Sequence, residues 1–136
     1  MSDTTRYLTV ADVLSLHNTV MEGLGYRPEP LRDQGLLKSA LLKPEMAAHY
    51  EDADIVRQAI VLAVGISQNQ PFVDGNKRTA YIVCYAFLRA NGLAFRGAPL
   101  EMANQLVLLA ERSDGLDAAT RRFEAWLRAH VAGETP

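Results

Sequence analysis

The sequence predicts an all-α fold in a single domain, residues 1–136, and three observations support this class. Apolar residues recur at the three- and four-residue spacing of amphipathic helices along most of the chain. Glycines, prolines and an Asn-Gly pair separate these stretches, as is typical where helices begin and end. No stretch has the alternation of a half-buried strand, so we expect no sheet. The 49% hydrophobic content is sufficient for one buried core.

The first helix is expected directly after Thr9, whose side chain can cap it. Asp12, three residues later, gives a weak form of the capping box, and Gly23 and Gly25 end the helix. Residues 26–32 follow as an extended loop, because each of its two prolines disfavours helical backbone at the residue before it.

The second and third helices each begin after an aspartate. Asp33 is the predicted cap of a short helix that ends before Pro44, and residues 45–50 are expected to form a separate helical turn. Asp54 is the predicted cap of the next helix, over residues 55–66, which is apolar around most of its circumference. A helix of this kind is buried on most sides, so we expect it at the centre of the domain.

A second central helix is expected to begin near Asn76 and to end at residues 91–92, an Asn-Gly pair that is a strong stop signal. The loop of residues 72–75, which follows Pro71, is expected to connect the two central helices. Residues 93–98 are expected to be a connector with a short extended piece. Pro99 is well placed as the first residue of the following helix.

The last helix is expected after a turn at residues 113–115, with Asp117 at its beginning. Residues 132–136 are expected to form a loose tail, as is typical of chain ends. The side chains of the last helix that should face the core are Phe123, Trp126 and Leu127.

Composition and charge narrow the class of function. The net charge of −2 and the pI near 5.9 disfavour a nucleic-acid-binding protein, which usually carries a basic stripe that neutralises phosphates. No apolar run approaches the roughly 18 residues needed to span a bilayer, so no membrane partner is expected. Cys84 is the single cysteine and the first residues show no apolar leader, which together favour a cytoplasmic protein.

Residues 69–80, Asn-Gln-Pro-Phe-Val-Asp-Gly-Asn-Lys-Arg-Thr-Ala, are the segment that carries chemistry. They combine a helix end, a tight loop and the start of a new helix, whose free N–H groups and partial positive charge attract anions. Gly75 allows the backbone to approach a ligand closely, and Asn76 either caps the helix or holds the shape of the loop.

Two cations and one carboxylate indicate a nucleoside triphosphate site in this segment. Lys77 and Arg78 lie in the first turn of the helix, where positive charge is unfavourable unless an external anion lies between them. Asp74 is a natural Mg²⁺ ligand beside such a site, because magnesium is usually held by one or two carboxylates and by substrate phosphates. On the residues alone, a solvated helix start without a ligand is an equal alternative.

Residues 71–80 resemble the central motif of the Fic/Doc superfamily, His-Pro-Phe-x-Asp/Glu-Gly-Asn-x-Arg. Other segments are similar to the Doc (death-on-curing) branch, and the similarity as a whole covers about residues 7–130. The resemblance implies a compact helical bundle in which the motif loop lies between the two central helices. The further similar segments are residues 7–17, 31–37, 87–92 and 126–127.

The resemblance also implies an activity, the transfer of part of ATP or another nucleoside triphosphate, with Mg²⁺, to a hydroxyl of a protein. Fic enzymes usually transfer AMP and carry a small residue where this chain has Lys77, whereas the Doc branch carries lysine and is linked to phosphorylation of elongation factor Tu. Lys77 therefore favours phosphorylation. A small antitoxin, whose disordered segment folds as a helix on the toxin, is the second implied partner.

The same resemblance assigns roles to the motif residues. Asp74 would position the metal and Asn76 the anion pocket, while Lys77 and Arg78 would hold phosphates and stabilise charge in the transition state. The complete set of expected nucleotide- and phosphate-binding residues is Phe72, Gly75, Asn76, Lys77 and Arg78.

Gln70 stands where the family motif has a histidine that is expected to accept the proton of the attacking hydroxyl. Glutamine can orient a hydroxyl but cannot take up a proton near pH 7, and general-base catalysis is worth about 10²–10⁴-fold. The sequence therefore predicts nucleotide binding with weak turnover. A deliberate change, a loss-of-function change selected during cloning and a natural pseudoenzyme are the three open origins of Gln70.

Two other functions stay open on the sequence alone. One is a Fic-type protein adenylyltransferase, and the other is a non-catalytic binding module, which the glutamine at position 70 motivates. His17, His49 and His130 are each expected to be structural or solvated. Cys84 is expected to be a core thiol, so we expect none of these residues to replace the missing base.

Overall fold

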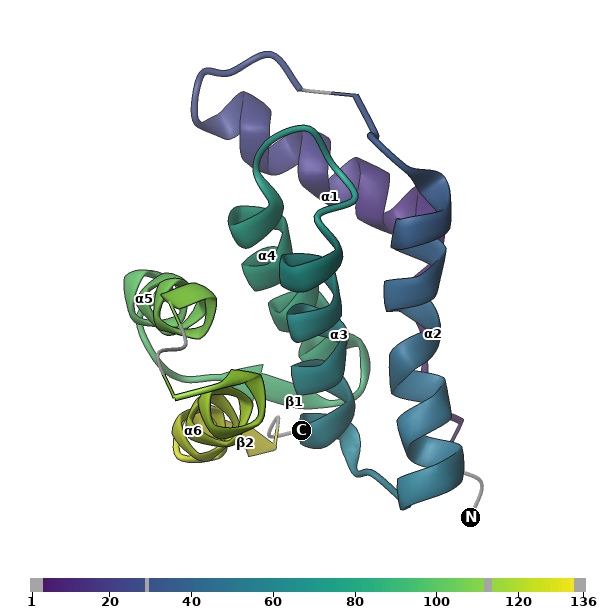
Figure 1. The fold of residues 1–136 in the computed structure, drawn as a ribbon. Helices are drawn as coiled ribbons and strands as arrows, with labels where there is room; N and C mark the ends of the chain where they lie inside the picture. Colours follow the sequence, from purple (N-terminus) through teal and green to yellow (C-terminus); the bar gives the residue numbers. More distant parts are fainter. Residues whose placement is uncertain (1–3, 29, 112–113, 134–136) are drawn as a thin grey trace.

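The computed structural model describes residues 4–28, 30–111 and 114–133 and, within them, has six helices and one small sheet (Figure 1). The predicted all-α class is confirmed apart from that sheet. Within the same residues, no helix is long and apolar enough to cross a membrane. The helices are α1 (Val10–Gly23), α2 (Gln34–Glu51), α3 (Ile55–Asn69), α4 (Asn76–Ala90), α5 (Pro99–Glu111) and α6 (Leu116–Arg128), and the strands are β1 (Leu93–Phe95) and β2 (Val131–Gly133).

The helices α3 and α4 form the centre of the domain, as their apolar sequences predict. They lie side by side, and the loop of residues 70–75 joins them at one end (Figure 1). α2 packs against α3, α1 packs against α4, and α5 and α6 cover the other side of the pair. The loop is therefore supported by two buried helices, which hold its side chains in fixed positions.

The core receives apolar side chains from all six helices. α2 and α3 approach each other closely at two small residues, since a Cβ added to Gly65 would lie 3.2 Å from the Cβ of Ala40. Burial of this continuous core is the main source of stability in a domain of this size. Its largest fully buried side chains include Phe72, Phe87, Phe123, Met21, Leu37, Ile60, Leu62 and Ile66.

The three predicted N-caps of the first half of the chain are confirmed. Thr9 and Asp12 form a reciprocal capping box, in which side chain and backbone bond at 3.1 and 2.9 Å. The carboxylates of Asp33 and Asp54 accept from backbone N–H groups in the first turns of α2 and α3, at 3.1 and 2.9 Å. Each cap contributes about 1 kcal/mol, which fixes where these helices begin.

The prediction that Pro44 ends the second helix is wrong. α2 continues through this proline to Glu51, so residues 45–50 belong to the same helix. An internal proline costs a helix about 3 kcal/mol or more, because it lacks the N–H that donates to the carbonyl four residues earlier. Burial of one continuous face against α3 outweighs this cost. The buried residues of that face are Leu37, Ala40, Pro44 and Ala47.

The expectation of no sheet is also wrong, although the sheet is small. β1 pairs antiparallel with β2, and Ala94 lies opposite Ala132 at the centre of the pairing. The prediction of a loose tail over residues 132–136 is therefore wrong for residues 132 and 133, and residues 134–136 lie outside the described part of the chain. Residue 113, the first of the predicted turn at residues 113–115, also lies outside it. Strands of three residues are too short to show an alternating pattern in the sequence.

Candidate functional site

The loop between α3 and α4 is fixed to the segment that precedes α2. Residues 30–33 lie antiparallel to residues 71–73, with Leu31 opposite Phe72 in an isolated bridge. The backbone N–H groups of residues 32 and 33 both donate to the carbonyl of Pro71, at 2.6 and 3.1 Å. These bonds join main chain to main chain, so the fold sets the path of the loop.

Asn76 holds the loop closed and does not cap α4, which decides between the two roles that the sequence left open. Its side-chain oxygen accepts from the N–H of Phe72 at 3.0 Å, and its side-chain nitrogen donates to the carbonyl of Phe72 at 2.9 Å. The N-cap residue is Gly75, and within the described residues no side chain caps the N–H groups of the first turn of α4. The first N–H groups of α4 are thus left for a ligand or water.

Gly75 is required at its position for two reasons. Its φ is +80°, a left-handed conformation that costs any residue with a side chain about 1–2 kcal/mol. A Cβ added there would lie 2.7 Å from Sδ of Met21 and 3.3 Å from Cε1 of His17, both on α1. The glycine therefore allows the loop to lie directly on α1.

Phe72 forms the base of the loop. It is 1% exposed and does not line the pocket. The sequence predicted a contact between Phe72 and the nucleotide, but the structure places its side chain beneath the loop. Its ring stacks on His17, with centroids 3.8 Å apart and planes at 7°. His17 in turn bonds through Nδ1 to Oγ1 of Thr79 at 2.8 Å. His17 thus connects α1, the loop and the first turn of α4, as the expected structural role implies.

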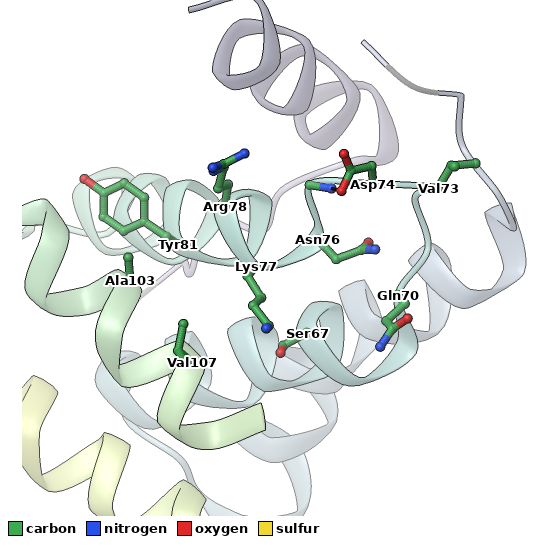
Figure 2. A pocket seen from close by; sticks show the side chains of 11 residues that line it. Ser67, Gln70, Val73, Asp74, Asn76, Lys77, Arg78, Tyr81, Ala103 and Val107 are labelled. Atoms are coloured by element: carbon green, nitrogen blue, oxygen red, sulfur yellow. Dashed lines mark hydrogen bonds between the residues drawn. The ribbon is translucent and has the colours of Figure 1, made fainter. Parts of the chain in front are cut away.

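A cavity of about 550 Å³ lies beside the loop and the start of α4 (Figure 2). All the predicted site residues except Phe72 line it. Sequence reasoning missed five further lining residues. Helical spacing could have found two of them, since Ser67 lies three residues before Gln70 and Tyr81 lies four after Lys77. Ala103 on α5 has no local signal, because only tertiary packing brings that helix to the pocket. The lining residues are Ser67, Gln70, Val73, Asp74, Gly75, Asn76, Lys77, Arg78, Tyr81, Ala103 and Val107.

The two cations of the motif leave the first turn of α4 in different directions (Figure 2). Lys77 extends toward Ser67 on α3, and Arg78 lies on the opposite side of the helix start. The guanidinium of Arg78 is 6.0 Å from the ring centroid of Tyr26, at the limit of a cation–π contact. Within the described residues, neither cation forms a salt bridge with a carboxylate. The pocket therefore carries positive charge that an anion can balance.

Among the described residues that line this pocket, Asp74 is the only one with a carboxylate. Its Oδ1 accepts from the N–H of Gly75 at 2.8 Å, which orients the carboxylate at the pocket wall. The described residues contain no cluster of three or more histidine, cysteine or acidic side chains that could hold a metal alone. This set fits Mg²⁺ bound by one carboxylate together with substrate oxygens, and it does not fit a metal held entirely by the protein.

The other candidate groups lie away from the pocket. Cys84 is fully buried on α4, and burial raises the pKa of its thiol to about 12, so it cannot act as a thiolate near neutral pH. His49 packs edge-on against Tyr50, and His130 bonds through Nδ1 to the carbonyl of Trp126 at 2.8 Å. None of these groups lines the cavity that contains position 70.

Comparison with known proteins agrees with this geometry. The family model described as the Fic/DOC family matches residues 7–88, which include α1 to α4 and the entire loop, apart from the last residues of α4. The chain belongs to the Fic/Doc family. A protein named Toxin Doc, from Mycolicibacterium smegmatis (strain ATCC 700084 / mc(2)155), is 34% identical over 91 residues, which are 65% of this chain and 67% of that protein. This similarity places the chain in the Doc branch of the Fic/Doc family.

In this Fic/Doc domain, residues 7–88, which the family model matches, include Lys77 and Arg78 but not α5, which also lines the pocket. Ala103 and Val107 lie beyond residue 88 and complete the cavity from a helix outside the family match. Gln70 follows the last residue of α3 and lines the same cavity as Asp74 and Lys77 (Figure 2).

Proposed function

We propose that this Doc-branch protein is the toxin of a toxin–antitoxin system and transfers a phosphate from a nucleoside triphosphate to a hydroxyl of a protein. The relative named Toxin Doc supports the toxin class, and Lys77 supports phosphate transfer. One observation carries the proposal: an uncapped helix start and two cations without carboxylate partners, among the described residues, line one cavity. A triphosphate supplies negative charge and acceptor oxygens to all three groups at once.

Each group of the pocket has a task in this transfer. The first N–H groups of α4 and the ammonium of Lys77 hold phosphate oxygens, and Arg78 offers its planar guanidinium to the group that is transferred. Asp74 would hold Mg²⁺, which would neutralise charge on the phosphate oxygens when bound. Asn76 keeps the loop closed, so these donors are in place before the substrate arrives. Positioning and electrostatics supply most of the catalysis in reactions of this class.

Gln70 limits the proposed reaction. Its amide can hydrogen-bond to the attacking hydroxyl but does not accept its proton, so the acceptor oxygen is a poor nucleophile. We expect the chain as written to bind ATP with Mg²⁺ but to transfer phosphate about 10²–10⁴-fold more slowly than a histidine variant. Elongation factor Tu is the proposed protein substrate, which also places the reaction in the cytoplasm.

The test compares three proteins: the chain as written, Gln70→His, and Gln70→His combined with Arg78→Ala. Each is incubated with Mg²⁺, elongation factor Tu and ATP labelled in either the γ- or the α-phosphate. We expect γ-label on the target with Gln70→His and little with the other two proteins. Label from the α-phosphate would instead select AMP transfer. No label on the target from any of the proteins would count against the proposed activity.

Gln70 also supports a second candidate function, a non-catalytic module that acts by binding. Growth inhibition on expression in bacteria separates the two functions. If the chain as written stops growth as strongly as its Gln70→His variant, then binding and not catalysis is the activity. We further propose a small antitoxin as the stable partner, and its co-expression should relieve inhibition by Gln70→His.

A further inference from the structure

We propose that Arg32 is a positioning residue, which fixes the backbone of residue 70 and so aims its side chain into the pocket. The inference rests on the proposed function, because it concerns the position from which the family's base would act. Arg32 lies outside the motif, 38 residues earlier in the chain, in the segment before α2. It does not line the cavity, so any effect on transfer would act through residue 70.

The end of α3 needs a donor from elsewhere. Gln70 has φ 49° and ψ 60°, a left-handed conformation that a residue with a side chain seldom adopts without support. The next residue, Pro71, favours extended backbone at the position before it. Pro71 also lacks an N–H, so it cannot donate to the carbonyls of the last helical turn as the residue after a helix cap usually does. Local forces alone would therefore move residue 70 out of its observed conformation.

Arg32 supplies the missing donors. Its Nε donates to the carbonyl of Gln70 at 2.9 Å, and its Nη2 donates to the carbonyls of Gln70 at 2.7 Å and Asn69 at 3.0 Å. Two nitrogens of one rigid guanidinium thus hold the last two carbonyls around the helix end, and its positive charge lies at the negative end of the α3 dipole. The backbone N–H of Arg32 also donates to the carbonyl of Pro71, the residue after Gln70, at 2.6 Å.

The arrangement bears directly on position 70. A change of the backbone angles there would turn the Cα–Cβ bond and carry the side chain away from Asp74 and Lys77, while the phosphate-binding groups on α4 would stay in place. The expected result of removing Arg32 is therefore a loss in the rate of transfer with little loss of nucleotide binding. A merely stabilising surface arginine would change neither quantity selectively.

The experiment uses Arg32→Gln and Arg32→Lys, made both in the chain as written and in Gln70→His. Arg27→Gln is the matched control, since Arg27 is an exposed arginine of the same connection and its replacement removes the same charge. Backbone ¹³Cα and ¹³Cβ chemical shifts of residue 70 report its conformation without any activity. Steady-state phosphate transfer, with kcat and the KM for ATP measured separately, reports its function.

We expect Arg32→Gln to move the residue-70 shifts away from left-handed values and to lower kcat of Gln70→His about 10- to 100-fold, the effect of a displacement of about 1 Å. The KM for ATP should change less than about threefold, because misplacing the base removes no ground-state contact with the nucleotide. Arg32→Lys should give an intermediate kcat, since a single ammonium replaces a planar donor that uses two nitrogens. Arg27→Gln should change neither measurement.

Unchanged residue-70 shifts in both Arg32 variants would overturn the inference, even if every protein is inactive. If Gln70→His transfers no phosphate while the shifts still move, the proposed function fails and the structural role of Arg32 stands. If the KM for ATP rises while kcat stays unchanged, Arg32 is a nucleotide-binding residue and its positioning role is refuted. Shifts confined to residues 69–71 and to the neighbours of position 32, with the rest of the spectrum unchanged, exclude general unfolding.

Discussion

Replacement of Gly75 by alanine tests whether both the backbone and the surroundings of this residue require glycine. Its φ of +80° costs a residue with a side chain about 1–2 kcal/mol. The new Cβ would also lie 2.7 Å from Sδ of Met21 and 3.3 Å from Cε1 of His17, and overpacking of such buried groups costs about 1–3 kcal/mol. We therefore expect Gly75→Ala to lower the free energy of unfolding by about 2–5 kcal/mol.

Gly92 is the matched control, because its φ is +84° and nothing lies within 4 Å of a Cβ placed on it. Gly92→Ala therefore carries the backbone cost alone, about 1–2 kcal/mol. Urea denaturation followed by circular dichroism measures both costs. In a Met21→Ala background, the cost of Gly75→Ala should fall toward that of Gly92→Ala, because the sulfur is gone. Equal costs for the two glycines in the unaltered background would refute the steric argument.

Three further results are expected. Arg78→Ala should weaken binding of ATP with Mg²⁺ about tenfold or more in calorimetry, because a charge-assisted hydrogen bond is worth about 1.5–3 kcal/mol; unchanged affinity would remove Arg78 from the site. The hydrogen bond from Arg128 lowers the pKa of Asp54, so their contact stabilises the fold above the unfolded pKa of about 3.9 and is lost as the pH falls through the lower folded value. Asp54→Asn keeps a capping side chain and should lower the free energy of unfolding by less than about 1 kcal/mol at pH 7. This difference should shrink below about pH 4, where the carboxylate of Asp54 becomes protonated. If the difference persists there, the contact with Arg128 is not its cause. Burial raises the pKa of the Cys84 thiol to about 12. Iodoacetamide at neutral pH should therefore label Cys84 in urea and not in the native protein. Rapid labelling of the native protein would show instead that the thiol is accessible.

The parts of the fold that the sequence predicted are those with local causes. Thr9, Asp33 and Asp54 cap helices through side chains that reach only three residues along the chain, so each signal is complete within a short window. The charge pattern of residues 74–78 identified the positive pocket for the same reason. The glycine at position 75 follows from the need for left-handed backbone at a tight turn.

The parts that the sequence did not predict depend on contacts between distant segments. Pro44 has a strong local signal to end a helix, yet the buried face of α2 overrides it through contact with α3. Phe72 has the residue type of a ligand contact, but only the approach of His17 from α1 shows that it is a buried support. Arg32 likewise acquires a partner only when the segment before α2 meets the end of α3.

The side chain at position 70 contributes little to the structure of the loop. Within the described residues, the hydrogen bonds of Gln70 use its backbone: the N–H donates to the carbonyl of Ile66, and the carbonyl accepts from Arg32. The amide side chain is exposed and, among the described residues, forms none. We therefore expect an exchange of glutamine for histidine here to leave the loop bonds intact and to change only a side chain that lines the pocket. Under the proposed function, the same geometry that makes Gln70 harmless to the fold makes it decisive for the chemistry.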